Sequence, residues 1–199
     1  MAVTGGTLRG SKTSWAGSVS PGPITYSADG TIGFVTIDSV GDNSADFTFI
    51  TNINPNRIDN DDCARIVWCW QSTSAFYALT YRISTTPIAF YFQKNSTVIN
   101  TNTIASYTLG SGGSKTNISI RIKKVGTTFT IGWDPAGGSA FTDIITSTDA
   151  SYSHGYAGYA TDATWDSGSQ SSLYFLSFTT AGATGKIPQE LFTSMMTSL

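Results

Sequence analysis

The clearest structural signal in the chain is the stretch from Asn117 to Asp134, which reads NISIRIKKVGTTFTIGWD. Its apolar residues recur at every second position, as Ile118, Ile120 and Ile122 and then as Phe129, Ile131 and Trp133. A period of two is typical of half-buried strands in an antiparallel sheet. A short turn at Gly126 separates the two runs, so the stretch predicts a β-hairpin.

The same period recurs before this hairpin, in residues 31–38, 45–52, 64–71, 75–84 and 87–93. Residues 171–180 are apolar on both faces and predict a central strand with something packed over its outer side. In residues 64–71 the alternation places Ile66, Trp68 and Trp70 on one face. Closely spaced strands without intervening helices indicate a sandwich or a barrel. We therefore expect one all-β domain over residues 24–180, built as a two-sheet antiparallel sandwich.

Composition agrees with a folded β domain and excludes several classes of function. Of the 199 residues, 40% are hydrophobic and 13% aromatic, which argues against disorder, and only 12% are charged. The net charge is −2 and no basic run exceeds Lys123-Lys124, so a nucleic-acid binder is not expected. No segment is apolar for long enough to predict a membrane span or a signal peptide. We expect synthesis in a cytoplasm without Sec export and no membrane insertion.

Both ends of the chain differ in character from the domain. Residues 1–23 form an arm rich in glycine and serine, and residues 181–199 form a linker and a tail. The tail has apolar residues at helical spacing, namely Ile187, Leu191, Phe192, Met195 and Met196. They predict a short C-terminal amphipathic helix, which is marginal alone and needs a surface to cover it. That surface is either the chain's own sandwich or a partner.

Two cysteines and a group of three aspartates are the candidates for a disulfide and for a metal site. Cys63 and Cys69 lie six positions apart in one predicted strand, about 20 Å if extended, which is too far for a disulfide. Asp59, Asp61 and Asp62 offer the oxygen ligands that Ca²⁺ prefers, but their order does not match an EF-hand loop. A solvated loop is favoured over a calcium site, and no other cofactor is expected.

Four stretches of the chain resemble the concanavalin A-like (laminin G-like) jelly-roll superfamily: residues 45–50, 75–82 and 117–133, and 155–160 taken with 172–178. The resemblance covers roughly residues 20–180 and implies a jelly roll of two antiparallel sheets, one of them concave. Members of that superfamily range from lectins and adhesion modules to glucanases and the capsid or tail proteins of bacteriophages.

Enzymatic chemistry is not expected. Glycoside cleavage needs two carboxyl groups, and the superfamily's glucanases carry two glutamates around an aspartate on one strand. The single glutamate here is Glu190, in the tail. His154 is the only histidine, and no Gly-x-Ser-x-Gly motif is present.

Glycan binding is the better candidate, because it needs aromatic faces beside amide or carboxylate groups. The richest such cluster comprises Tyr156, Tyr159, Asp162, Trp165 and Asp166, with ordinary loop packing as the alternative interpretation. Trp15, Trp68, Trp70 and Trp133 are expected in the core.

Two functions follow from these observations. The first is a non-enzymatic virion surface protein, a capsid decoration or tail fibre, whose tail residues dock on other virion subunits or on a second copy of the chain. The alternative is a soluble, lectin-like carbohydrate-binding module that adheres to a surface glycan.

Overall fold

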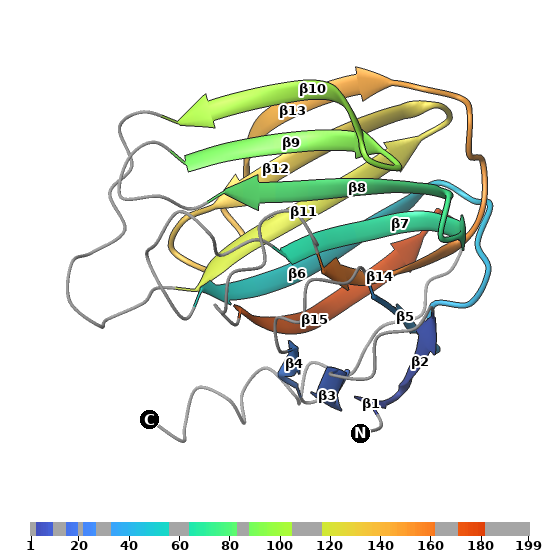
Figure 1. Cartoon of the computed structure of the whole chain (residues 1–199). Coiled ribbons are helices and arrows are strands. Elements are labelled where there is room, and N and C mark those ends of the chain that lie inside the picture. Colours follow the sequence, from blue (N-terminus) through green and yellow to red (C-terminus); the bar gives the residue numbers. More distant parts are fainter. Residues whose placement is uncertain are drawn as a thin grey trace.

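The computed structural model describes residues 3–9, 15–19, 22–26, 33–55, 64–82, 88–104, 117–161 and 171–181. Within these ranges the chain forms two sheets that face each other, confirming the expected all-β sandwich (Figure 1). One sheet has eight strands, in the order β1 (Val3–Thr4), β3 (Trp15–Ser18), β4 (Ile24–Tyr26), β15 (Ser171–Thr180), β6 (Phe47–Pro55), β11 (Ile118–Val125), β12 (Thr128–Asp134) and β13 (Thr142–Thr148). The other has seven, in the order β10 (Thr97–Ile104), β9 (Ile88–Lys94), β8 (Ala75–Arg82), β7 (Ala64–Ser72), β14 (Tyr156–Thr161), β5 (Phe34–Ile37) and β2 (Gly6–Arg9).

The hairpin predicted from residues 117–134 is confirmed as β11 and β12, inside the eight-stranded sheet. Ile122 pairs with Ile131 and Ile120 with Trp133, so the apolar residues of both strands share the inner face. The turn residue Gly126 has a φ of 57°, a left-handed conformation that glycine adopts without steric cost. β6 pairs with the other side of β11 and β13 with the other side of β12, so the hairpin is flanked by a strand on each side.

An aromatic core fills the space between the two sheets. Trp68 on the seven-stranded sheet stacks on Phe92 at 5.4 Å between ring centroids and contacts Phe129 from the opposite sheet at 6.0 Å. Tyr77 lies 4.8 Å from the same Phe129 ring. All four side chains are fully buried, and each stabilises the fold by roughly 2–3 kcal/mol through its removal from water.

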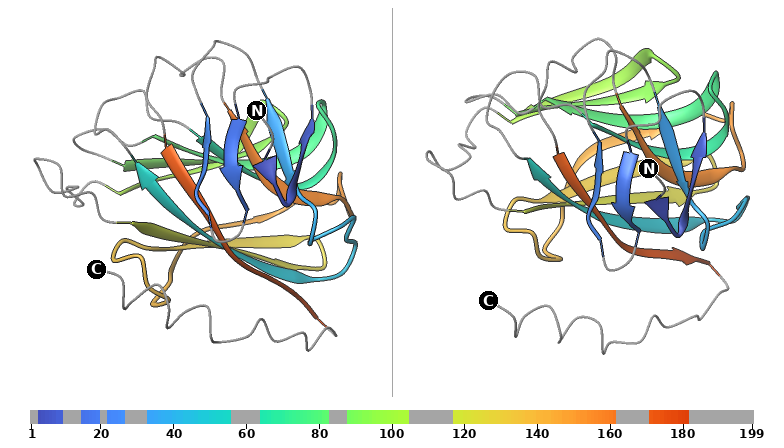
Figure 2. Two further views of the ribbon diagram at one scale, coloured as in Figure 1. Left: turned by 90° about the horizontal axis from the view of Figure 1, so that it is seen from below. Right: turned by 60° about the horizontal axis from the view of Figure 1, so that its bottom comes forward.

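The N-terminal segment differs from the separate arm that was expected. β1 and β3 join the eight-stranded sheet, whereas β2 joins the seven-stranded sheet along β5. Figure 2 shows these short blue strands beside β15, and Trp15 of β3 is fully buried in the core. The pairing of β1 with β3 is parallel, an exception to the antiparallel pattern. Strands of two to four residues are too short to produce a recognisable alternation in the sequence.

Several predictions fall outside the described residues and stay predictions. They are the C-terminal helix with Ile187, Leu191, Phe192, Met195 and Met196, the calcium candidates Asp59, Asp61 and Asp62, and Cys63. Among the residues that are described, no helix has the length and apolar character needed to cross a membrane.

Candidate functional site

A second apolar cluster lies on the outer face of the seven-stranded sheet, apart from the core between the sheets. It comprises Phe34, Val67, Trp70, Phe76, Ala78 and Ala160, with the partly buried Tyr156 packed against it, and is called the outer cluster below. Neighbouring residues on the same strands, such as Val35, Trp68 and Tyr159, belong to the core instead. The outer face of a two-layer sandwich normally meets water with polar side chains. Aromatic residues gathered there therefore call for an explanation other than core packing.

Trp70 reaches this face because β7 contains a bulge. Cys69 has a φ of 49°, which is left-handed, and the pairing of β7 with β8 shifts register between Trp68 and Ser72. As a result Trp68 and Cys69 both belong to the core, and the alternation restarts with Trp70 on the outer face. The expectation that Trp70 shares a face with Ile66 and Trp68 is therefore wrong.

Arg9 of β2 lies over the rings of the outer cluster. Its guanidinium carbon is 5.3 Å from the Trp70 ring centroid and 5.2 Å from that of Tyr156, and the two rings are 6.4 Å apart. Both distances are within the range of cation–π attraction. Arg9 Nε also donates a hydrogen bond of 3.3 Å to Thr36 Oγ1, so the side chain is held from two directions. Arg9 and Tyr156 are partly exposed, whereas Trp70 is only 7% exposed.

Exposed polar groups lie next to the outer cluster in the sequence, at the ends of β7 and β14. Gln71 follows Trp70 and donates a 3.0 Å hydrogen bond from Nε2 to the backbone oxygen of His154. His154 Nδ1 is 2.9 Å from Asp42 Oδ1. Aromatic rings combined with amide, imidazole and guanidinium groups are the composition of a small-molecule or sugar site.

A row of buried polar side chains extends the same outer face. Arg65 of β7 pairs in register with Thr80 of β8, and Thr80 Oγ1 donates a 2.7 Å hydrogen bond to Gln93 Oε1 of β9. All three residues are less than 9% exposed. Arg65 also pairs in register with Ala160 of β14, a member of the outer cluster, so the buried polar row adjoins the cluster.

The predicted glycan cluster is divided by the structure. Tyr156 belongs to the outer cluster, but Tyr159 is fully buried in the core and its hydroxyl is 2.7 Å from Thr51 Oγ1. Burial raises the pKa of Tyr159 above its ordinary value. Because its ring lies between the sheets, Tyr159 is not available to a ligand at the surface. The participation of Asp162, Trp165 and Asp166, which lie outside the described residues, stays a prediction.

Arg9 and Trp70 were missed by sequence reasoning. Arg9 sits in a glycine-rich segment without visible periodicity, and Trp70 appears in phase with Trp68 when a regular strand is assumed. The left-handed backbone at a cysteine leaves no sequence signal, so only the structure brings the two residues together.

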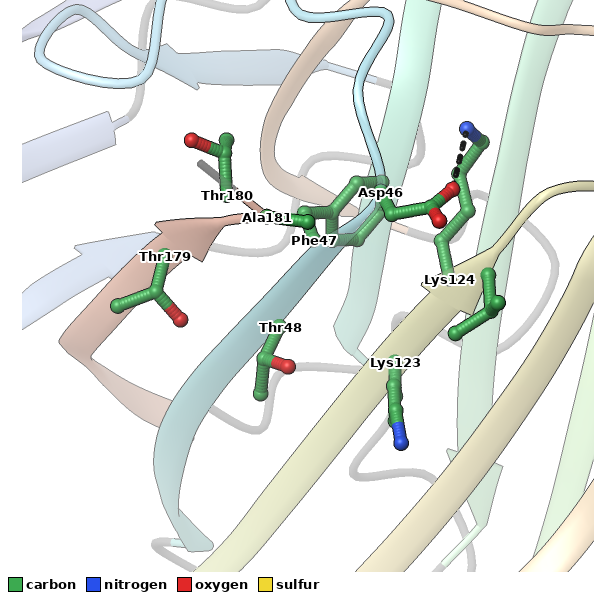
Figure 3. A pocket seen from close by; sticks show the side chains of 9 residues that line it. Asp46, Phe47, Thr48, Lys123, Lys124, Thr179, Thr180 and Ala181 are labelled. Atoms are coloured by element: carbon green, nitrogen blue, oxygen red, sulfur yellow. Dashed lines mark ion pairs between the residues drawn. The ribbon is translucent and has the colours of Figure 1, made fainter. Parts of the chain in front are cut away.

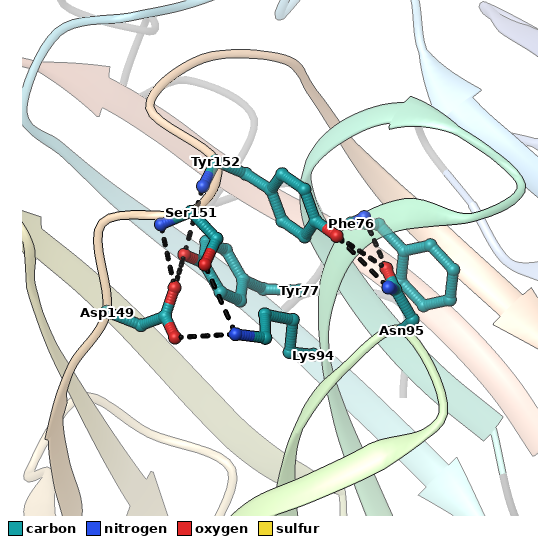
Figure 4. Close-up of polar contacts among 7 residues, drawn as sticks. All are labelled: Phe76, Tyr77, Lys94, Asn95, Asp149, Ser151 and Tyr152. Carbon is teal, nitrogen blue, oxygen red and sulfur yellow. Dashed lines mark hydrogen bonds and ion pairs between the residues drawn. The ribbon is translucent and has the colours of Figure 1, made fainter.

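Two other polar groupings act within the fold. Asp149, between β13 and β14, accepts hydrogen bonds from the Tyr77 hydroxyl, from Lys94 Nζ at 3.1 Å and from the Ser151 backbone at 2.8 Å (Figure 4). Burial alone would raise the pKa of Asp149, but these hydrogen bonds outweigh it and hold the pKa below its ordinary value. Burial and the bond to Asp149 both raise the pKa of Tyr77. These groups bind one another, so we interpret them as a structural link within the fold.

A hollow of about 260 Å³ lies where β6, β11 and β15 meet, lined by Asp46, Phe47, Thr48, Lys123, Lys124, Val125, Thr179, Thr180 and Ala181 (Figure 3). Lys124 Nζ is 3.9 Å from Asp46 Oδ1 and donates to the backbone oxygen of Ser44 at 3.3 Å. The buried ammonium group of Lys124 therefore already has acceptors within the protein. Throughout the described part of the chain, no three His, Cys, Asp or Glu side chains gather as metal ligands.

No family model and no curated protein matches this sequence. Solved structures do match the fold. The carbohydrate-binding module CBM66 from Bacillus subtilis superposes with a TM-score of 0.62 and 15% identity, over 88% of this chain and 95% of that one. The legume lectin-like domain from Entamoeba histolytica gives 0.59 and 10%, over 89% and 91% of the two chains. The exoplasmic domain of VIP36, in a form bound to Ca²⁺ and Man3GlcNAc, gives 0.52 and 10%, over 89% and 86%.

These likenesses confirm the fold as a two-sheet jelly roll like that of lectins. At such low identities the likeness concerns the fold alone, and the site has to be argued from the residues of this chain.

Proposed function

We propose that the chain is a non-catalytic carbohydrate-binding module that holds a glycan on the outer face of its seven-stranded sheet. The observation that carries the proposal is the outer cluster with Arg9 laid across Trp70 and Tyr156. The six members of the outer cluster are themselves less than 9% exposed, so the surface offered to a ligand is that of Arg9 and Tyr156, which are partly exposed. The proteins that share the fold include a carbohydrate-binding module and a legume lectin-like domain, which supports the same class of function.

The chemistry of the outer cluster suits a sugar. A pyranose ring presents apolar C–H groups on its faces and hydroxyls at its edge, so it binds where an aromatic surface lies beside hydrogen-bonding groups. Tyr156 supplies a partly exposed ring, and Gln71 and His154 supply polar groups next to it.

The proposal is tested by replacing the exposed ring. Tyr156→Ala is expected to weaken glycan binding by about fivefold, because the loss of an aromatic contact costs roughly 1 kcal/mol and a tenfold change is about 1.4 kcal/mol. The measurement is a glycan microarray to find ligands, followed by titration calorimetry on the strongest of them.

Tyr174→Ala is the matched control, since Tyr174 is also partly buried but pairs with Asn52 on the other sheet. It is expected to bind glycan as the unaltered protein does. Equal weakening by both substitutions would contradict the location of the site, and a folded protein that binds no glycan on the array would contradict the function.

A virion role as capsid decoration or tail fibre, with docking through the tail, is proposed from the sequence alone. It is compatible with glycan binding, because a protein exposed on a particle can also adhere to host sugars.

A further inference from the structure

We propose that the glycan held by the outer cluster is acidic and that Arg9 binds its carboxylate. This inference rests on the proposed function and names the class of sugar. The ligand is an oligosaccharide that contains a uronate or another sugar carboxylate.

The side chain of Arg9 is oriented before any ligand arrives. Two ring contacts at 5.3 and 5.2 Å hold the guanidinium plane, and the hydrogen bond from Nε to Thr36 fixes its direction. Arginine ordinarily loses considerable side-chain freedom when it binds a ligand. Here most of that loss has already occurred on folding, so binding through Arg9 costs less.

The Nη atoms of the Arg9 guanidinium are not bound by any other described residue. Among the described residues, no ion pair involves Arg9 and no acceptor takes a hydrogen bond from its Nη atoms. The carboxylates that follow β5 have other partners, because Asp38 accepts from Thr7 Oγ1 at 2.6 Å and Asp42 lies beside His154. A planar guanidinium with free N–H groups on one edge matches a carboxylate through two parallel hydrogen bonds.

The competing ligand is a neutral sugar stacked on the Trp70 and Tyr156 rings. Because the guanidinium lies over both Trp70 and Tyr156, it covers part of the surface that a neutral pyranose would need. An arriving sugar meets the cation first, so a carboxylate gains more from this site than a hydroxyl does.

The test compares acidic and neutral forms of the same oligosaccharides on the full chain. The probes are oligogalacturonate against its methyl ester, and sialylated lactosamine against the desialylated form. We expect the acid to bind at least about tenfold more tightly than its neutral counterpart in one of these pairs, since hydrogen bonds to charged groups are roughly twice as strong as neutral ones. The preference is expected to shrink as salt is raised.

Variants then assign the preference to Arg9. Arg9→Gln is expected to abolish the difference between acid and neutral ligand, and Arg9→Lys to restore only part of it, because lysine lacks the planar fork. Arg121→Gln is the matched control, since Arg121 lies over Phe141 at 5.0 Å on the eight-stranded sheet and is expected to leave the preference unchanged. Circular dichroism establishes that each variant is folded.

The possible outcomes distinguish the preference for acidic glycans from the proposed glycan binding itself. Equal binding of acid and neutral forms, or a preference that survives in folded Arg9→Gln, overturns this inference and leaves the proposed function standing. Failure of the folded wild-type protein to bind any glycan overturns both. If Arg9→Gln does not fold, the esterified and desialylated ligands still decide the question on the unaltered protein.

Discussion

The hydroxyl of Tyr77 donates a hydrogen bond to the carboxylate of Asp149, joining the seven-stranded sheet to the segment that leaves the eight-stranded sheet. Tyr77 is also packed against Phe129 in the core, so one side chain contributes to both the apolar and the polar links between the sheets. Lys94, at the end of β9, closes the arrangement with its 3.1 Å contact to the same carboxylate.

Asp149→Asn is expected to lower the free energy of unfolding by about 1–3 kcal/mol at neutral pH, because Tyr77 and Lys94 lose a charged acceptor. The pKa of Asp149 is lower in the folded protein than its ordinary value of 3.8, so the folded state binds this proton less tightly than the unfolded state. The stabilisation is therefore complete above the ordinary pKa and declines as the pH falls below it. Urea unfolding of both proteins at about pH 7 and about pH 3 measures the effect.

The difference in the free energy of unfolding between wild type and Asp149→Asn should be smaller at the acidic pH. Asp143→Asn is the control, since the Arg121–Asp143 pair has an exposed carboxylate and such pairs contribute only about 0–1 kcal/mol. A gap that is the same at both pH values would show that the Asp149 charge does not contribute to stability.

Gly158→Ala is expected to destabilise the protein by 2 kcal/mol or more, on the order of a severe overpacking substitution. Gly158 lies on β14 between β5 and β7, and a Cβ there would be only 2.0 Å from the backbone oxygen of Val35. Thermal unfolding is the measurement. Gly41→Ala is the comparison, because Gly41 has a φ of 66° but open space around it, so that its cost of about 1 kcal/mol is conformational. Equal costs would argue against a steric origin at Gly158.

The Cys69 thiol is expected to resist alkylation in the native protein. Burial raises its pKa to about 12, so almost no thiolate is present at neutral or mildly alkaline pH. Iodoacetamide treatment followed by peptide mass spectrometry should find Cys69 unmodified in the folded protein and modified after denaturation in urea. Rapid native labelling of this peptide would show that the bulge opens to solvent.

Removal of residues 183–199 tests docking through the tail. If the predicted helix is an assembly element, the full chain is expected to be oligomeric in light scattering and the truncated chain monomeric. Charged residues at Leu191 and Met195 should have the same effect as truncation, with the sandwich still folded. If full-length and truncated proteins are equally monomeric, the tail does not join copies of this chain, and docking would need a different partner subunit.

The sequence predicted best where the strands are long and regular. The Ile118–Val125 and Thr128–Asp134 pair was found with its turn and its inner face, because a strict period of two over a hairpin has few alternative interpretations. Residues 75–84, another run with a period of two, contain β8, and Tyr77, Leu79 and Tyr81 of that strand are all in the core.

Prediction failed where a local irregularity changed the period. The left-handed Cys69 moved Trp70 to the outer face. Tyr156 and Tyr159 are three positions apart on β14, so regular alternation already places them on opposite faces, and only one of them could face a surface ligand. Arg9 could not be connected to either residue, since its position depends on β2 joining the sheet beside β5. Two of the three site residues, Trp70 and Arg9, thus stand at positions that alternation does not assign.

The place of β15 has a consequence for synthesis of the protein on the ribosome. β15 lies between β4 and β6, so β1, β3 and β4 are joined to the rest of the eight-stranded sheet only through a strand made from residues 171–180. Until that strand has left the exit tunnel, the exposed edges of β4 and β6 have no partner there. The sandwich therefore closes only after translation of almost the whole domain, and pairings of such long sequence separation form slowly. Nascent chains that pause before residue 171 would be the species most in need of a chaperone.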